Sequence, residues 1–240
     1  MNKFAFIFMA MLTLSWLSCD TLQQIQKTVE ESASGGTLSD TDIVSGLKQA
    51  LEVGAGNAVK TLNKTDGFLK DPLVKIAFPP DAQRAADKLR DLGMSKLVDD
   101  FVTTLNRGAE KAAGQATPIF VNAVKEMTFQ DARGILQGPD NAATEYFKGK
   151  TSNALAAKFS PIIKFTLDDV NATKYWTDIT TTYNKIPFVN KVETDLVKYT
   201  TGKALDGLFL KLEGEERKIR TDPAARVTEL LRKVFGSVTR

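Results

Sequence analysis

The sequence predicts an all-α protein, folded as a single bundle-like domain of about nine or ten helices. Apolar residues recur at helical spacing through most of the chain, and Ser, Thr or Asp residues stand where helix N-termini need a cap. Runs that alternate between apolar and polar residues, bounded by hairpin turns, are absent from the sequence. With 240 residues, of which 42% are apolar, the chain can bury a large core.

The first half of the domain divides into three predicted helices and one irregular stretch. A Ser-x-x-Asp start at residues 39–42 favours a helix up to residue 62, in which Gly54-Ala55-Gly56 would permit close packing. Residues 63–80 hold three Pro and one Gly and are predicted to be irregular. Pro80 then opens a short helix to residue 92, which Gly93 is predicted to stop, and the next helix covers residues 95–115.

The second half divides at Pro and Gly residues in the same way. Helices are predicted over residues 117–127 and 128–138, the latter with a capping box at Thr128-Phe129-Gln130-Asp131. Two or three helices fill residues 140–186, with Pro161 and Pro187 as breaks. A long helix over residues 190–217 and a final helix over residues 222–236 complete the prediction.

The N-terminus has the pattern of an export signal. Residues 1–18 carry one Lys and then an apolar run that is shorter than the roughly 20 residues needed to span a bilayer. Ser18-Cys19 resembles a lipoprotein processing site, so we expect Cys19 to be acylated and residues 19–37 to form a flexible tether. An ordinary cleaved signal with an incidental Cys is the alternative. The domain would then be residues 38–240, with a possible sub-boundary near residue 187.

Composition excludes many chemistries. The chain has no His, which excludes Ser-His-Asp catalysis and imidazole metal sites, and its one Cys lies at the predicted processing site. A net charge of +3 is too small to favour nucleic acid as a partner. No cofactor is predicted, and the sequence singles out no catalytic residue and no particular metal.

The segment 95–115 carries the clearest candidate site. At helical spacing Asp99, Thr103, Asn106 and Glu110 form one stripe beside its apolar face. Such a stripe could coordinate a hard cation or bind a polar ligand, or it could be a solvated face with pairs such as Lys96–Asp100. In residues 63–80, Phe68 and Phe78 could likewise form a lid over an apolar cleft or attach the loop to the core.

Several short motifs occur in a familiar order. They are TDGF (65–68), LVDDF (97–101), NR (106–107), EKA (110–112), PIF (118–120), MT (127–128), DA (131–132), GPD (138–140), ALDGLF (204–209), IR (219–220) and DPAAR (222–226). Together, over residues 40–236, they resemble the domain of unknown function 4197 family. The resemblance implies a helical, exported and often lipid-anchored protein, and implies no activity or cofactor. The polar residues in and near these motifs are the candidate site residues: Asp66, Asp99, Asp100, Asn106, Arg107, Glu110, Asp131, Asp140, Arg220 and Arg226.

These observations favour a membrane-anchored envelope lipoprotein, facing the periplasm, that is not an enzyme. Its helical domain would bind a partner protein, or an apolar ligand in a cleft between helices. The alternative is a hydrolase of an envelope polymer that uses carboxylates, with or without a divalent metal. That alternative requires two candidate carboxylates about 5–9 Å apart across a cleft. The sequence does not predict the oligomeric state.

Overall fold

The computed structural model describes residues 39–185, 191–193 and 195–226, and residues 228, 229, 232, 234 and 236. Within these residues the chain is helical and contains no strand, which confirms the predicted all-α class. The chain divides into two compact units, residues 1–41 and 42–240. The signal, Cys19 and the tether, like the sub-boundary near residue 187, lie outside the described residues and stay predictions.

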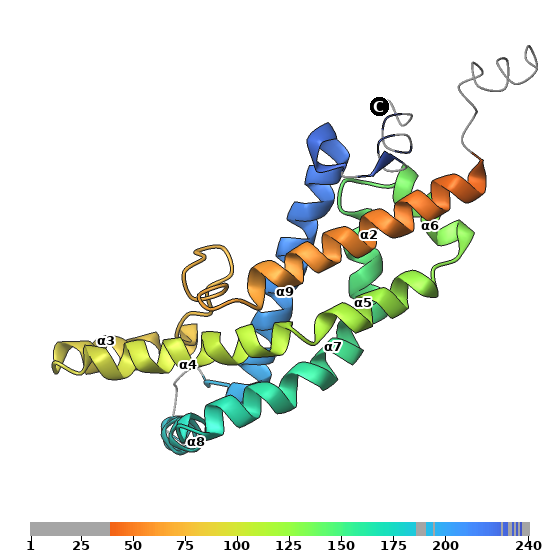
Figure 1. Ribbon diagram of the computed structural model, residues 1–240. Coiled ribbons are helices and arrows are strands. Elements are labelled where there is room, and N and C mark those ends of the chain that lie inside the picture. Colours follow the sequence, from red (N-terminus) through yellow and green to blue (C-terminus); the bar gives the residue numbers. More distant parts are fainter. Residues whose placement is uncertain are drawn as a thin grey trace, which may run out of the picture. The chain divides into compact units, whose positions relative to one another are not determined.

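The described part contains eight α-helices and two 3-10 helices, fewer α-helices than the nine or ten predicted (Figure 1). They are α2 (Asp40–Leu62), η1 (Pro80–Ala82), α3 (Gln83–Asp91), α4 (Ser95–Ala113), α5 (Ala116–Lys125), α6 (Phe129–Gln137), α7 (Ala142–Asp168), α8 (Ala172–Tyr183), α9 (Leu196–Thr221) and η2 (Pro223–Ala225). None of these helices is both long enough and apolar enough to cross a membrane.

Two local predictions differ from the structure. Pro161 was predicted to break a helix, but it lies inside α7, which continues to Asp168. Pro161 and Ala157 are both exposed, so the carbonyl that lacks a proline N–H partner can bind water instead. After Asp222 the backbone first forms the 3-10 turn η2, and the described residues 229, 232, 234 and 236 of the predicted final helix are helical.

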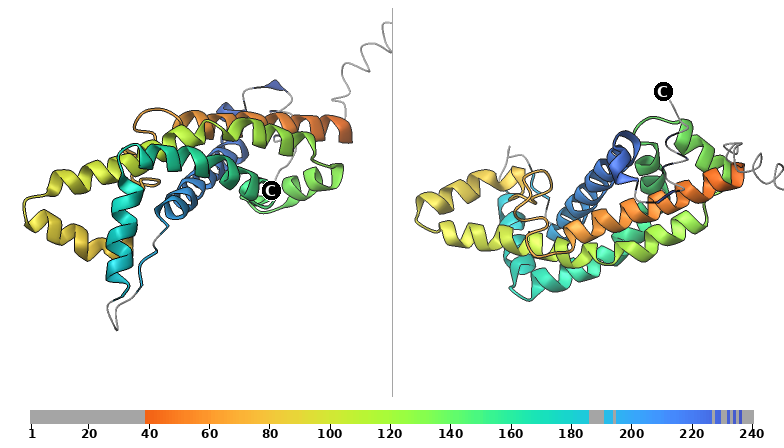
Figure 2. Two further views of the ribbon diagram at one scale, coloured as in Figure 1. Left: turned by 90° about the horizontal axis from the view of Figure 1, so that it is seen from below. Right: turned by 45° about the horizontal axis from the view of Figure 1, so that its top comes forward.

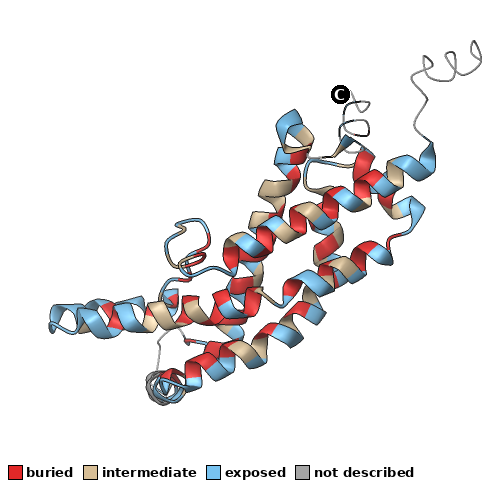
Figure 3. Ribbon diagram, viewed as in Figure 1, coloured by how far each residue is buried: buried red, intermediate tan, exposed pale blue. Residues whose placement is uncertain are grey.

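The core lies where α4, α7 and α9 pack together (Figure 2). Phe120 of α5 contacts Phe147 of α7 at a ring separation of 4.9 Å, and both side chains are buried. In Figure 3 the buried residues follow the inward faces of these helices, as amphipathic helices require. Of the candidate residues, Asn106 and Glu110 on α4 and Arg220 on α9 lie in this packed region.

The helices α3 and α4 form an antiparallel hairpin that projects from the other helices of this unit (Figures 1 and 2). Gly93, with φ +80°, ends α3 in a conformation that other residues rarely adopt. Met94 N donates to the Leu89 carbonyl and Gly93 N to the Arg90 carbonyl, which together form a Schellman motif. The predicted stop at Gly93 is confirmed.

The irregular stretch between α2 and η1 is attached to the core. Phe68 is fully buried, and Phe78 packs against Phe101 of α4 and Trp176 of α8 at ring separations of 4.9 and 5.7 Å. Of the two interpretations that the sequence left open, the structure supports attachment to the core. Backbone N–H groups of this loop donate hydrogen bonds to Asn106 and Glu110, two members of the polar stripe of α4. These contacts determine what the two side chains can bind.

Candidate functional site

The first group of polar residues is the loop-binding cluster, made of Asp66, Asn106, Arg107 and Glu110. Glu110 is only 4% exposed, although it lies on the flank of α4. One carboxylate oxygen accepts hydrogen bonds from the Phe68 N–H at 3.1 Å and the Leu69 N–H at 3.3 Å. Its other oxygen accepts from Arg107 Nη1 at 2.6 Å. The desolvation of a buried carboxylate is thus offset by three donors.

Arg107 joins Glu110 to the loop. Its second terminal nitrogen, Nη2, donates to Asp66 Oδ1 at 2.7 Å, and Asp66 also pairs with Lys70 at 2.8 Å. Hydrogen bonds from Lys70 and then Arg107 lower the pKa of Asp66 below its ordinary value of 3.8. Hydrogen bonds to Glu110 and then Asp66 raise the pKa of Arg107. Asp66 and Arg107 therefore stay charged at neutral pH.

Asn106 holds the same loop at a second point. Its Oδ1 accepts from the Ile76 N–H at 2.9 Å, while Nδ2 donates to the Ile76 carbonyl at 2.8 Å and the Val102 carbonyl at 2.7 Å. Both amide donors are used, and the side chain is fully buried. The Asn106 side chain and the Ile76 backbone thus exchange two hydrogen bonds, as residues of paired strands do. These bonds hold the end of the irregular stretch against α4.

The stripe of α4 therefore binds the protein's own loop. The oxygens of Asn106 and Glu110 that could coordinate a cation accept hydrogen bonds from loop N–H groups. In the part of the chain that the structure describes, no group of three or more acidic, His or Cys side chains could hold a metal ion. Asp99, from the same stripe, is exposed, with a carboxylate oxygen 3.8 Å from Arg90 Nη2 on α3.

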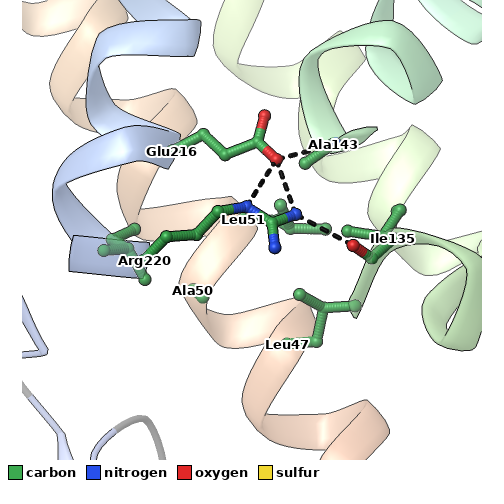
Figure 4. Close-up of a pocket in the computed structure, with 8 residues that line it drawn as sticks. Leu47, Ala50, Leu51, Ile135, Ala143, Glu216 and Arg220 are labelled. Carbon is green, nitrogen blue, oxygen red and sulfur yellow. Dashed lines mark hydrogen bonds and ion pairs between the residues drawn. The ribbon is translucent and has the colours of Figure 1, made fainter. Parts of the chain in front are cut away.

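The second group is the Glu216–Arg220 pair, buried on α9 (Figure 4). Glu216 Oε1 accepts from Arg220 Nε and Nη2 at 3.0 and 2.8 Å and from the Ala143 N–H at 3.0 Å. Its Oε2 accepts from the Thr144 N–H at 2.9 Å and the Thr144 hydroxyl at 2.8 Å. Arg220 Nη2 donates further to the Ile135 carbonyl at 2.9 Å. The pair thus connects α6, α7 and α9.

The charges of this pair match the helix ends that they meet. Glu216 binds the first N–H groups of α7, where the helix dipole is positive, and Arg220 binds a carbonyl near the end of α6, where it is negative. Both side chains are almost fully removed from water, at 5% and 10% exposure. One ion pair therefore supplies hydrogen-bond partners both to N–H groups at the start of α7 and to a carbonyl near the end of α6.

A small pocket lies beside this pair, between α2, α6 and α9 (Figure 4). Its empty volume is about 230 Å³, part of it open to solvent. It is lined by Leu47, Ala50, Leu51, Ile135, Ala143, Ile219 and the two charged residues. The enclosed part has room for about one water molecule, so an acyl chain would not fit without movement of the helices.

The remaining candidates are not gathered at either group. Asp131 forms the predicted capping box with Thr128 at the start of α6, and Asp140 is exposed in the turn before α7. Asp100 is exposed and pairs with Lys96 on α4. Arg226 donates to the Ile219 and Arg220 carbonyls at the end of α9. Cys19 lies outside the described residues.

Sequence reasoning named Arg220 but missed Glu216. Glu216 lies in the acidic and basic run EGEER, which is typical of a solvated surface. The available signal is its spacing: Glu216 follows Leu208 and Leu212 at intervals of four and precedes Ile219 by three, so it falls on the apolar face. A charged residue on such a face, four residues before an Arg, indicates a buried pair.

Comparison with known proteins identifies the family and gives no activity. Neither the curated proteins nor the solved structures include a significant match to the chain. The family model described as a protein of unknown function, DUF4197, matches residues 37–236. This match covers most of the chain and confirms the resemblance inferred from the ordered motifs. The chain belongs to the DUF4197 family.

Proposed function

We propose that this protein is an exported, lipid-anchored envelope module without enzymatic activity, which binds a protein partner through the tip of the α3–α4 hairpin. The observation that carries the proposal is the exposure of three apolar side chains at that tip. Leu92, Met94 and Leu97 are 66%, 44% and 53% exposed. Leu92 and Met94 flank Gly93 in the turn, and Leu97 lies in the first turn of α4. The hairpin that carries them projects from the other helices of this unit (Figure 3).

The hairpin has the features of a docking element. An exposed cluster of large apolar side chains at one place is uncommon on a soluble surface unless something covers it. The hairpin sequence, residues 83–100, holds four acidic and four basic residues. Arg90 contacts Asp87 and Asp99, and Lys96 pairs with Asp100, so the rim presents both signs of charge. An apolar centre with a polar rim is the usual arrangement of a protein interface.

The other sequence-based options receive less support. The pocket beside Glu216 is too small for an apolar ligand, which leaves the protein partner as the preferred option. A hydrolase would need carboxylates that face a cleft. Glu110 and Glu216, the deeply buried carboxylates of the two groups, instead accept hydrogen bonds from backbone N–H groups and from Arg residues.

The membrane anchor rests on the N-terminal sequence. The apolar run before Cys19 and the polar residues after it support acylation and a tether. Mass spectrometry of the N-terminal peptide from the native host should show acyl chains on Cys19. A C19S variant should then carry no acyl chain at this position. An unmodified Cys19 in a membrane-free protein would contradict this part of the proposal.

Partner binding is tested with the full chain in its own host. A photoreactive amino acid at Leu97 should give one discrete crosslinked product. The matched control is Leu210, which is similarly exposed at 43% but lies on α9. Crosslinking at Leu97 should disappear when Leu92 and Met94 are changed to Ser. Equal products from both positions, or none from Leu97, would contradict a specific site at the hairpin tip.

A further inference from the structure

The outer face of α7 is unusual for a helix at the surface. Apolar residues on most of its inner side fill the core, including Phe147, Leu155 and Phe159. Its solvent side nevertheless carries a second apolar stripe, Ala154, Ala157, Pro161 and Phe165, at intervals of three and four residues. Helices that are apolar on both sides are normally covered on both sides.

Phe165 is the most exposed member of this stripe. Its side chain is 73% exposed near the end of α7, a large apolar area to leave in water. The three preceding members are small or cyclic, so the stripe forms a smooth strip with one aromatic ring at its end. Val170, in the turn after α7, and Tyr175, in the first turn of α8, are also more than half exposed.

Lysines flank the stripe. Lys150 and Lys158 are exposed, and within the described residues neither forms an ion pair with an acidic side chain. Lys150 Nζ lies 5.8 Å from the centre of the Tyr146 ring. The pKa of Asp131 is lowered by its hydrogen bonds from Thr128 and then by the charge of Lys150. Lys164 on the same face is neutralised by Asp168. The face therefore carries a net positive charge beside its apolar stripe.

We infer that this α7 outer face, defined by Lys150, Ala154, Ala157, Lys158, Pro161 and Phe165, lies on an anionic phospholipid surface. Lysines beside an apolar strip that ends in an aromatic residue are characteristic of helices that rest in the membrane interface. Protein interfaces, in contrast, are depleted in Lys and enriched in Arg. Charge complementarity thus favours lipid headgroups over a protein as the occupant.

This second surface is independent of the hairpin and of the acyl anchor. Leu92, Met94 and Leu97 lie on α3, the turn after it and α4, whereas the lipid-binding residues are all on α7. An anchor alone would hold the domain near the membrane in any orientation. Contact through α7 would add an orientation, with one fixed side of the domain on the headgroups.

The test uses residues 38–240, because residues 42–240 form a compact unit with their own core. This fragment lacks the anchor, so any vesicle binding must come from the folded domain. It is sedimented with vesicles of phosphatidylcholine alone and with vesicles of equal parts phosphatidylcholine and phosphatidylglycerol. We expect binding to the anionic vesicles only, and binding that weakens as salt is added.

Two charge-matched variants locate the contact. K150Q/K158Q should weaken binding to anionic vesicles by about 30-fold, since each Lys near such a surface contributes about fivefold. K60Q/K75Q removes the same charge from exposed positions on α2 and the loop after it, and should change binding by less than about threefold. F165S should weaken binding by about tenfold, because the ring no longer enters the interface.

Three results would overturn the inference. They are no binding to anionic vesicles, an equal loss in both charge variants, or full binding by F165S and K150Q/K158Q. The hairpin variant L97S should bind vesicles as the unchanged fragment does. If L97S alone abolished vesicle binding, the hairpin tip would be the lipid contact, which would refute the α7 assignment and the proposed protein partner together.

Discussion

Two Glu–Arg pairs with the same spacing lie on α9 and differ chiefly in burial. Glu216 and Arg220 are 5% and 10% exposed, whereas Glu213 and Arg217 are 32% and 65% exposed. Replacing each Glu by Ala removes the same group from the same helix. The structure predicts very different changes in the free energy of unfolding, so the comparison measures what burial adds to a pair.

The size of the difference follows from the partners. E216A leaves the Ala143 and Thr144 N–H groups without their acceptor and the buried Arg220 guanidinium without a counter-charge. Removing one member of a buried ion pair costs about 3–5 kcal/mol. E213A breaks an exposed i,i+4 pair, which costs about 0.3–0.5 kcal/mol.

Urea unfolding of residues 38–240, followed by far-ultraviolet circular dichroism, would measure both changes. With a slope of about 2 kcal/mol per molar urea, E216A should lower the midpoint by about 1.5–2.5 M and E213A by about 0.2 M. In E216A/R220A the loss should be smaller than the sum of the two single losses, because no unpaired charge remains. Similar midpoints for E216A and E213A would refute the argument that the buried pair holds α6, α7 and α9 together.

Three further predictions concern the loop between α2 and η1. N106A should lower the free energy of unfolding by about 2–4 kcal/mol in the same assay and expose the Ile76 amide to hydrogen exchange, because that residue loses two hydrogen bonds. G207A would place a Cβ 2.8 Å from the buried ring of Phe68 and should lower the free energy of unfolding by about 1–3 kcal/mol. The matched variant G202A has open space around its Cβ and should stabilise α9 by about 0.5–1 kcal/mol. Thermal unfolding of both variants would show whether the two changes have opposite signs. Folding lowers the pKa of Asp66, so its ionised form stabilises the fold above pH 3.8, and this contribution is lost as pH falls through the folded pKa. The unfolding midpoint of D66N should therefore depend less on pH in this range than that of the unchanged chain.

Local signals in the sequence predicted most helix boundaries. The capping box at Thr128 and Asp131, the stop at Gly93 and the start at Pro80 all lie where expected. Each depends on backbone groups within a few residues, which a sequence pattern can reveal. The prediction that Pro161 breaks a helix was wrong because the effect of a proline depends on whether water can reach the carbonyl four residues before it. The packing of α7 determines that access, and a sequence pattern does not show it.

The candidate site was predictable only in part, for a related reason. Helical spacing placed Asn106 and Glu110 on the flank of the α4 apolar face, and their side chains do point from that flank. Periodicity cannot show which distant segment covers a flank. The partners are loop backbone groups 30 to 42 residues away, at Ile76, Phe68 and Leu69, so a stripe that resembled a ligand site serves to fix a loop.

The candidate residues therefore fall into two groups, according to what their side chains bind. Glu110 and Arg220 form hydrogen bonds with buried backbone groups, so replacing either residue should mainly lower the stability of the fold. Asp99 and Asp100 make only exposed ion pairs on the hairpin, which contribute little to stability. Because the same hairpin presents apolar side chains to solvent, these two carboxylates are placed to select a partner by charge. Arg90 and Lys96 lie beside these carboxylates, so a partner that docks on the tip should offer both acidic and basic groups around an apolar recess.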